Sequence, residues 1–114
     1  GVGTEELIQQ LAALPERPPA GVPVYAVDMY DHTLPWSLKR TVTMVGYRDE
    51  LGDAVDWEKD KFVPDLMSFA ERWRAARAAW AILPVGEAEK LPRELGIPVQ
   101  VLARGPQYAI VRKP

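Results

Sequence analysis

The stretch YDHTLPWSLKR, residues 30–40, holds the densest group of side chains in this sequence that could do chemistry. It contains His32, the only histidine, which follows Asp31 directly and lies four residues after Asp28. An imidazole near carboxylates can act as a general base or bind a metal ion. A transition-metal site normally takes three or four ligands, and the chain has no cysteine and no second histidine to complete one. We therefore expect neither a metal site nor a catalytic residue here, and interpret the stretch as a junction between a strand and a helix.

The sequence also lacks the motifs of a serine nucleophile and of a phosphate-binding loop. Ser37 and Ser68 both lie outside a G-x-S-x-G turn, and a hydroxyl without a positioned base is a weak nucleophile. A phosphate loop needs several glycines, yet Gly86 stands alone and is followed by two glutamates. The triplet at 56–58, Asp-Trp-Glu, is similar to the metal motif of nucleotide-sugar enzymes, but its acid-rich surroundings favour a solvated loop. No independent enzyme and no cofactor are expected.

Length and composition fit one ordinary globular domain. The chain has 114 residues, of which 47% are hydrophobic and 26% charged. A net charge of -2 and a pI near 5.4 exclude the basic surface that nucleic-acid binding needs, so no nucleic-acid partner is expected. No apolar run approaches the roughly 20 residues of a membrane-spanning helix. Because the chain opens with GVGTEELIQQ and lacks an initiator methionine, we interpret it as a piece of a longer protein.

An N-terminal helix and a linker are predicted to precede the main domain. Thr4 can cap this helix. Its apolar face consists of Leu7, Ile8, Leu11 and Leu14. The stretch PERPPAGVP, residues 15–23, carries four prolines and is typical of a linker that joins the helix loosely to the rest. We accordingly divide the chain into residues 1–21 and a single α/β domain over residues 22–114.

Strand and helix patterns alternate along that domain. Strands are predicted over residues 22–27, 41–45, 79–83, 97–103 and 107–113. Three helical segments are predicted between them: a short helix from Asp31 or Thr33 to Arg40, a long helix from Asp65, and helical turns over residues 86–95 that Pro92 interrupts. An acid-rich loop is predicted over residues 48–61. The order predicts a layered α/β fold: a largely parallel small sheet flanked by helices, with an antiparallel hairpin at the C-terminus.

The long helix carries the clearest apolar stripe. Its members are Leu66, Phe69, Trp73, Ala76 and Trp80. The arginines beside it, Arg72, Arg74 and Arg77, could receive an anionic head group, but a solvated helix flank is the favoured interpretation. Trp36, Trp73 and Trp80 are interpreted as anchors of a core or an interface, since the basic surroundings of a nucleic-acid platform are missing.

Several segments in succession resemble one known family. They are Tyr30-Asp31, Leu34-Pro35, Leu38-Lys39-Arg40, Tyr47 with Arg48-Asp49-Glu50-Leu51, Phe62-Val63 before the long helix, and the closing hairpin PVQVLARGPQYAIVRKP. This order and spacing, from about Val22 to Lys113, is similar to the soluble C-terminal domain of bacterial aminoarabinose-transferase-like glycosyltransferases. Those are polytopic membrane enzymes related to the protein mannosyltransferases.

The resemblance implies a parent enzyme on the periplasmic face of the inner membrane. Such an enzyme moves a sugar from a polyprenyl-phosphate carrier, undecaprenyl phosphate, to lipid A or another periplasmic acceptor. The family's catalytic carboxylate lies in the transmembrane part, so it implies no catalytic residue here, and Asp31 is not its counterpart. The partners it implies are the transmembrane part of the same chain and the lipid carrier or acceptor. Side chains that could face this ligand or acceptor are Tyr30, Asp31, His32, Trp36, Lys39 and Arg40.

A second hypothesis belongs to a different class of protein. Loops at the carboxyl ends of strands are where open α/β sheets bind ligands. The loop from Asp28 to His32 follows the first predicted strand. A free-standing module that binds a small ligand or regulates a partner through this loop is therefore the alternative.

Overall fold

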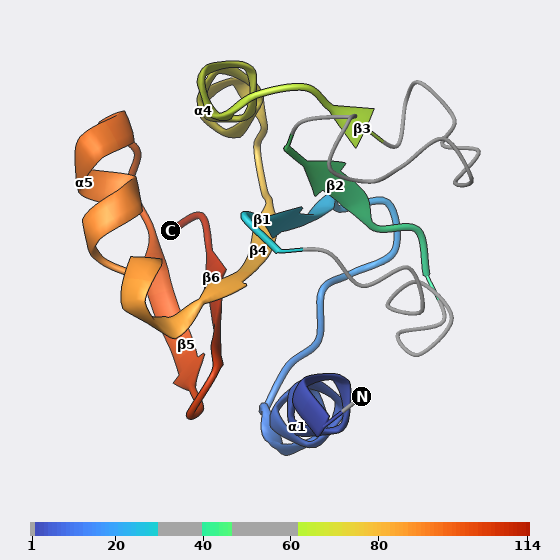
Figure 1. Ribbon diagram of the computed structural model, residues 1–114. Coiled ribbons are helices and arrows are strands. Elements are labelled where there is room, and N and C mark those ends of the chain that lie inside the picture. The colour runs from blue at the N-terminus through green and yellow to red at the C-terminus, as the bar shows by residue number, and fades with distance from the viewer. Residues whose placement is uncertain (1, 30–39, 47–61) are drawn as a thin grey trace, which may run out of the picture.

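The computed structural model describes residues 2–29, 40–46 and 62–114, and its six strands there form one sheet (Figure 1). The strands are β1 (Val24–Val27), β2 (Thr43–Val45), β3 (Phe62–Val63), β4 (Trp80–Pro84), β5 (Gln100–Arg104) and β6 (Tyr108–Arg112). The helices are α1 (Val2–Ala13), α4 (Leu66–Ala75), α5 (Lys90–Leu95) and the 3-10 helix η2 (Val85–Glu87). In the order β3-β2-β1-β4-β6-β5 the first four strands are parallel, and β6 is antiparallel to β4 and β5. The predicted fold class is confirmed.

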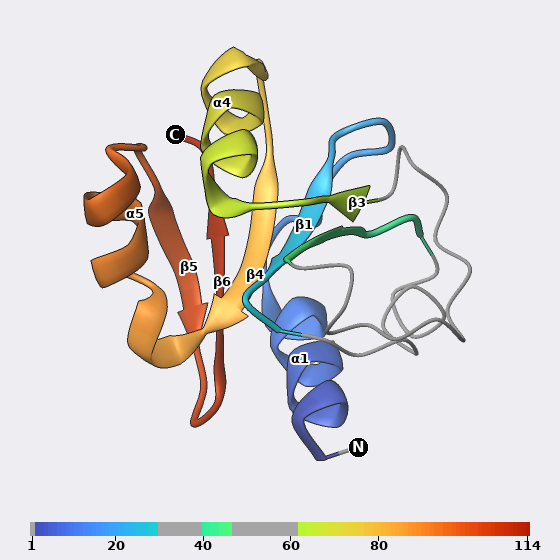
Figure 2. The same ribbon diagram turned by 45° about the horizontal axis from the view of Figure 1, so that its top comes forward.

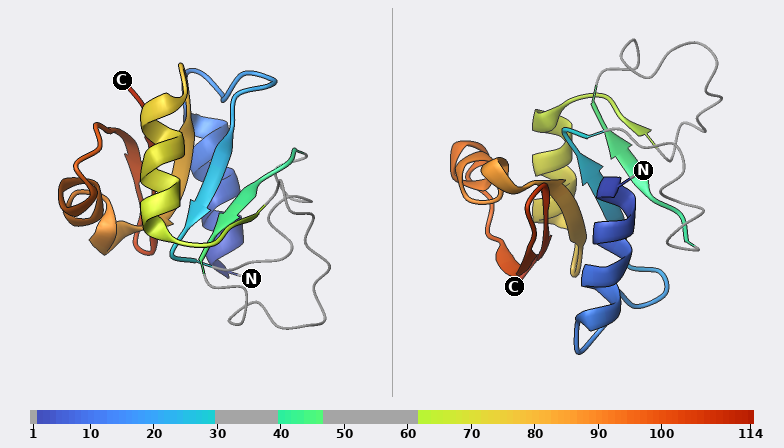
Figure 3. Two further views of the ribbon diagram at one scale, coloured as in Figure 1. Left: turned by 90° about the horizontal axis from the view of Figure 1, so that it is seen from above. Right: turned by 60° about the horizontal axis from the view of Figure 1, so that its bottom comes forward.

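The sheet is buried on both faces because its strands are apolar throughout. In β1, Tyr25 and Val27 pack in a cluster with residues of α4 and α5, whereas Val24 and Ala26 pack in a second cluster with α1. Parallel strands covered on both sides are typically continuous apolar runs, as β1 and β4 are. The left view of Figure 3 shows α4 in front of these strands and α1 behind them. The result is three layers, with α1 alone among the described helices on its side.

Leu7 is the anchor of α1, since its side chain is fully buried in the second cluster. Leu11 and Leu14 are partly buried against the same cluster. The helix begins at Val2, two residues before the predicted cap, so Thr4 lies inside it. Packing therefore ties α1 to the sheet, while the division of the chain at residue 21 stays a prediction.

The turn of the β5–β6 hairpin lies against the first half of α1 (Figure 2). A Cβ atom on Gly105 would overlap the carboxylate of Glu6, so this glycine permits the close approach. Farther along, Glu16 forms an ion pair with Arg112 at the end of β6. These contacts join the two ends of the sequence.

The long helix begins as predicted but ends earlier. The Asp65 carboxylate accepts a 2.7 Å hydrogen bond from the backbone N–H of Ser68, which is the geometry of an N-cap. Ala76 is already the C-cap, with extended backbone. The predicted stripe is thus wrong at its end, because Trp80 is the first residue of β4 and packs on the opposite face of the sheet from Trp73.

Two further elements differ from prediction. Pro92 does not interrupt a helix, because it lies in the first turn of α5, where backbone N–H groups lack helical partners anyway. β3 was not predicted as a strand; its two residues are too short for an alternating pattern. The predicted short helix before Arg40 and the acid-rich loop at 48–61 lie outside the described residues. In the part of the chain that the structure describes, no helix has the length and apolar character to cross a membrane.

Candidate functional site

Of the six residues predicted to face a ligand or acceptor, the structure describes only Arg40. Tyr30, Asp31, His32, Trp36 and Lys39 lie outside the described residues. Their roles remain predictions.

Arg40 binds the proline-rich loop that leads into β1. Its Nη1 atom donates to the carbonyl of Pro18 at 2.8 Å, and Nη2 donates to the carbonyls of Val22 at 2.5 Å and Pro19 at 3.5 Å. These acceptors lie 22, 18 and 21 residues before Arg40 in the sequence, so the side chain holds the loop against the start of β2. Burial lowers the pKa of Arg40 from its ordinary value, because the charged form is partly removed from water. A guanidinium remains protonated at physiological pH even so.

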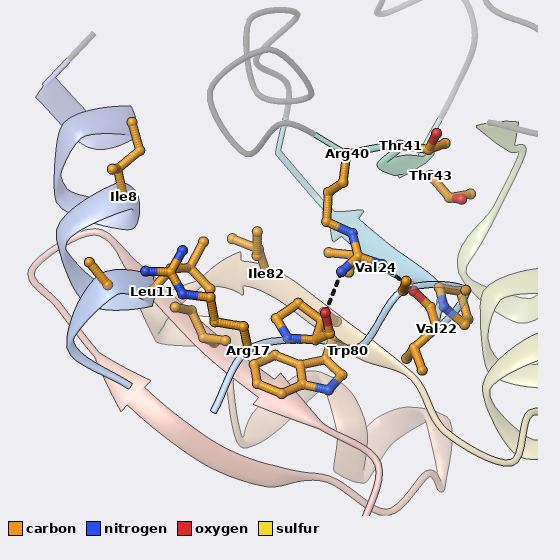
Figure 4. Close-up of a pocket in the computed structure, with 17 residues that line it drawn as sticks. Ile8, Leu11, Arg17, Val22, Val24, Arg40, Thr41, Thr43, Trp80 and Ile82 are labelled. Atoms are coloured by element: carbon orange, nitrogen blue, oxygen red, sulfur yellow. Dashed lines mark hydrogen bonds between the residues drawn. The ribbon is translucent and has the colours of Figure 1, made fainter. Parts of the chain in front are cut away.

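A pocket of about 780 Å³ lies beside this contact, on the face of the sheet that α1 covers (Figure 4). It is lined by apolar side chains of α1, of the loop before β1, and of the sheet. These include Ile8, Leu11, Val22, Val24, Trp80, Ile82 and Ile110. The pocket is therefore at the amino ends of the parallel strands, where β1 and β4 begin.

The polar lining of this pocket is cationic. Arg17 and Arg40 approach it from different sides in Figure 4, and no acidic residue is among its described lining residues. The Nε atom of Arg40 is buried and has no hydrogen-bond partner within the described ranges. The pocket is thus a large apolar hollow with a cation on each of two sides, and one donor, the Nε–H of Arg40, has no partner in the described part of the chain.

The alternative hypothesis puts a ligand at the carboxyl ends of the parallel strands, where the described residues offer fewer features of a binding site than the pocket does. Asp28 follows β1 with φ of 52°, an uncommon conformation for a residue other than glycine, and its side chain is exposed. Within residues 2–29, 40–46 and 62–114 no three His, Cys, Asp or Glu side chains come together to hold a metal ion. The hydroxyl of Tyr25 is a poor acid or base, because burial raises its pKa and the nearby Arg72 charge offsets this only partly.

The arginines predicted to lie beside the apolar stripe have the exposed positions expected of solvated side chains. Arg72 and Arg74 of α4 are exposed, and so is Arg77, which lies after the C-cap of this helix. Nη2 of Arg74 donates to the carbonyl of Leu95 at the end of α5. Lys113 donates to the carbonyl of Arg74, so a cation lies at the C-terminus of α4, where the helix dipole favours it.

Sequence reasoning did not find the pocket. Its members come from five segments, from Ile8 to Ile110, and no single segment contains a recognisable motif. Arg17 was predicted only as part of a linker, and Trp80 as part of a helical stripe, of the strand over residues 79–83 and of a core or interface. The available signal was the apolar face of α1, which predicts that this helix packs against another apolar surface of the domain.

Comparison with known proteins extends the family resemblance to almost the whole chain. Residues 9–113 match the family described as the aminoarabinose transferase C-terminal domain. The chain belongs to this family. No protein of curated function matches it.

Two crystal structures of ArnT from Cupriavidus metallidurans are similar to this aminoarabinose transferase C-terminal domain. The structure bound to undecaprenyl phosphate has 29% sequence identity and a TM-score of 0.68, and the match covers 97% of this chain. The apo structure has 30% identity and a TM-score of 0.66 over 96% of this chain. The matched regions make up 20% and 19% of those ArnT chains, so the present chain spans about a fifth of their length.

Proposed function

We propose that this chain is the periplasmic C-terminal domain of a polytopic membrane glycosyltransferase. The parent enzyme moves a sugar from a polyprenyl-phosphate carrier to lipid A or another periplasmic acceptor. The observation that carries the proposal is the family match over residues 9–113, together with the similarity in fold to an ArnT chain bound to undecaprenyl phosphate.

The domain's own role is proposed to be non-catalytic. Arg40 spends its hydrogen bonds on carbonyls of the proline-rich loop, and Tyr25 is buried with a raised pKa. Neither group is arranged as an acid, base or nucleophile. Such a domain contributes by covering the catalytic cavity, by offering a surface to the acceptor, or by stabilising the membrane part of the same chain. Its partners are that membrane part and the lipid carrier or acceptor.

The test uses the full-length gene. We expect around a dozen transmembrane spans upstream of residue 1, carrier-dependent sugar transfer by the full-length enzyme, and none by the 114-residue chain alone. Transfer by the isolated chain would refute the non-catalytic role. An upstream region without transmembrane spans would refute the membrane parent.

The acceptor-facing role of Lys39 and Arg40 needs separate variants. Because Arg40 also holds the proline-rich loop, reversing its charge would disturb folding as well as any ligand contact. Lys39→Glu in the full-length enzyme is therefore the sharper variant. A loss of transfer with an unchanged melting temperature supports the role, and unchanged transfer removes Lys39 from the site.

A further inference from the structure

We propose that the pocket between α1 and the sheet binds an amphipathic anion, a single alkyl chain that ends in one phosphate or carboxylate group. This goes beyond the proposed function, because it assigns this domain a ligand of its own.

The apolar part of the argument starts from Ile8. It is one of two large hydrophobic side chains that are exposed in the described ranges, at 39% exposure, and it lines this pocket. The indole of Trp80 and the side chain of Ile82 form part of the sheet side of the same hollow. A volume of about 780 Å³ is within the range of pockets that bury most of a small ligand. An alkyl chain seated here would cover apolar surface that is otherwise left to water.

The charged part of the argument rests on Arg17 and Arg40. Neither forms an ion pair with an acid in the described part of the chain, and the described lining of the pocket contains no acid. Arg40 is fixed by three loop carbonyls, which are neutral and do not compensate its positive charge. Its buried Nε–H has no described partner. A partly buried cation with an unused donor is stabilised by an anion that can accept a hydrogen bond from it.

The placement of the unused donor favours a ligand with its head group at one end. Figure 4 shows the Arg40 side chain beside Val24, where β1 begins, and the Arg17 side chain on another side of the pocket, beside Leu11 of α1. A phosphate or carboxylate at Arg40, whose Nε–H has no described partner, would leave its alkyl chain to run between α1 and the sheet. Since both head groups accept bidentate hydrogen bonds from arginine, the experiment distinguishes them.

The test titrates the 114-residue chain with monomeric ligands by calorimetry, below their micelle concentrations. Octyl, nonyl and decyl phosphate are compared with octanoate, nonanoate and decanoate, and decanol and inorganic phosphate serve as single-feature probes. We expect saturable 1:1 binding of at least one anionic series. Each added methylene should tighten binding roughly fourfold until the pocket is full, and decanol and inorganic phosphate should bind at least about tenfold more weakly than the decyl anion.

Variants locate the binding site, with folding checked by thermal unfolding. Ala12→Phe fills the pocket from α1, and the neighbouring Ala13→Phe is its control because Ala13 is exposed and is not among the lining residues. Arg17→Glu removes one cation, and Arg93→Glu on α5 makes the same charge change on another helix. Ala12→Phe and Arg17→Glu should each weaken binding at least about tenfold, and the controls less than about twofold.

Several results would overturn the proposal. These are the absence of saturable binding by both anionic series, equal affinity for decanol and the decyl anion, or equal effects of Ala12→Phe and Ala13→Phe. The chain-length series uses the unmodified chain, so it decides the matter even if a variant fails to fold. Whichever head group binds more tightly identifies the chemistry of the natural ligand.

Discussion

Replacing Leu7 by alanine is expected to destabilise the whole domain, although residue 7 lies before the proline-rich loop. Its side chain is fully buried against apolar residues of the sheet, including Ile82 and Ile110. In the part of the chain that is described, no other helix covers this face. Truncation would therefore leave a cavity that only a shift of α1 could close.

The magnitude follows from the burial. Replacing a fully buried leucine by alanine typically lowers the free energy of unfolding by about 2–5 kcal/mol. The loss comes from the transfer free energy of the removed atoms and from the cavity that is left behind. Because α1 is held at the edge of the domain and can partly collapse, about 3 kcal/mol is the expected decrease in the free energy of unfolding. For a domain of this size that corresponds to a decrease in melting temperature of roughly 12 °C.

Urea unfolding followed by tryptophan fluorescence and by circular dichroism measures this change. The control is Ile8→Ala, because Ile8 is the next residue of the same helix and is 39% exposed; its effect should stay within about 0.5 kcal/mol. If Leu7→Ala changes stability by no more than the control, α1 is a loose appendage and the packing described here is wrong.

Three further predictions concern other contacts of the described structure. Trp73→Phe should cost about 1–2 kcal/mol, because the indole N–H donates to the carbonyl of Pro98 at 2.8 Å and phenylalanine leaves that carbonyl to water; urea unfolding measures it. Arg40→Met should cost about 1–2 kcal/mol and raise protease cleavage in the proline-rich loop, since it removes three hydrogen bonds made by a partly exposed cation. Asp65→Ala should lower the melting temperature at neutral pH by removing the cap of α4. The hydrogen bond from Ser68 lowers the pKa of Asp65, so its contribution is complete above about pH 4 and is lost as the pH falls through the lower folded-state pKa.

Each of these predictions has a matched comparison. Trp73→Ala should cost more than Trp73→Phe, about 3–5 kcal/mol, and equal costs would mean that the ring does not pack as described. Arg40→Lys keeps the charge but cannot reach all three carbonyls, so full recovery of stability would contradict these hydrogen bonds. For Asp65, a difference between the wild type and Asp65→Ala that persists unchanged at pH 2 would show that the carboxylate is not the cap.

Local patterns predicted most of the fold, because they reflect local physics. The apolar run of β1 and the cap of α4 at Asp65 follow directly from residue type. Trp80 was assigned both to the helical stripe and to the predicted strand over residues 79–83, because helical spacing persists by chance into β4. Only the C-cap at Ala76 and the pairing with β1 decide where the helix stops. Pairing partners are set by tertiary contacts, which periodicity does not record.

The pocket could not be predicted from the sequence either, because it also depends on tertiary contacts. Arg17 and Arg40 become neighbours of one hollow only because β1, β2 and β4 lie side by side and α1 crosses their face. No spacing rule connects residue 17 to residue 80 or to residue 110. The family resemblance, in contrast, was visible in the sequence, since it depends on the succession of short motifs.

Sugar transfer by the full-length parent tests the central proposal most directly. The purified enzyme is incubated with lipid A and with undecaprenyl-phosphate aminoarabinose, and the products are followed by mass spectrometry. In the lipid A form of the proposal, the full-length enzyme transfers aminoarabinose to lipid A, and the 114-residue chain leaves lipid A unmodified. Transfer from a soluble nucleotide sugar in place of the lipid carrier, or by the chain alone, would contradict it.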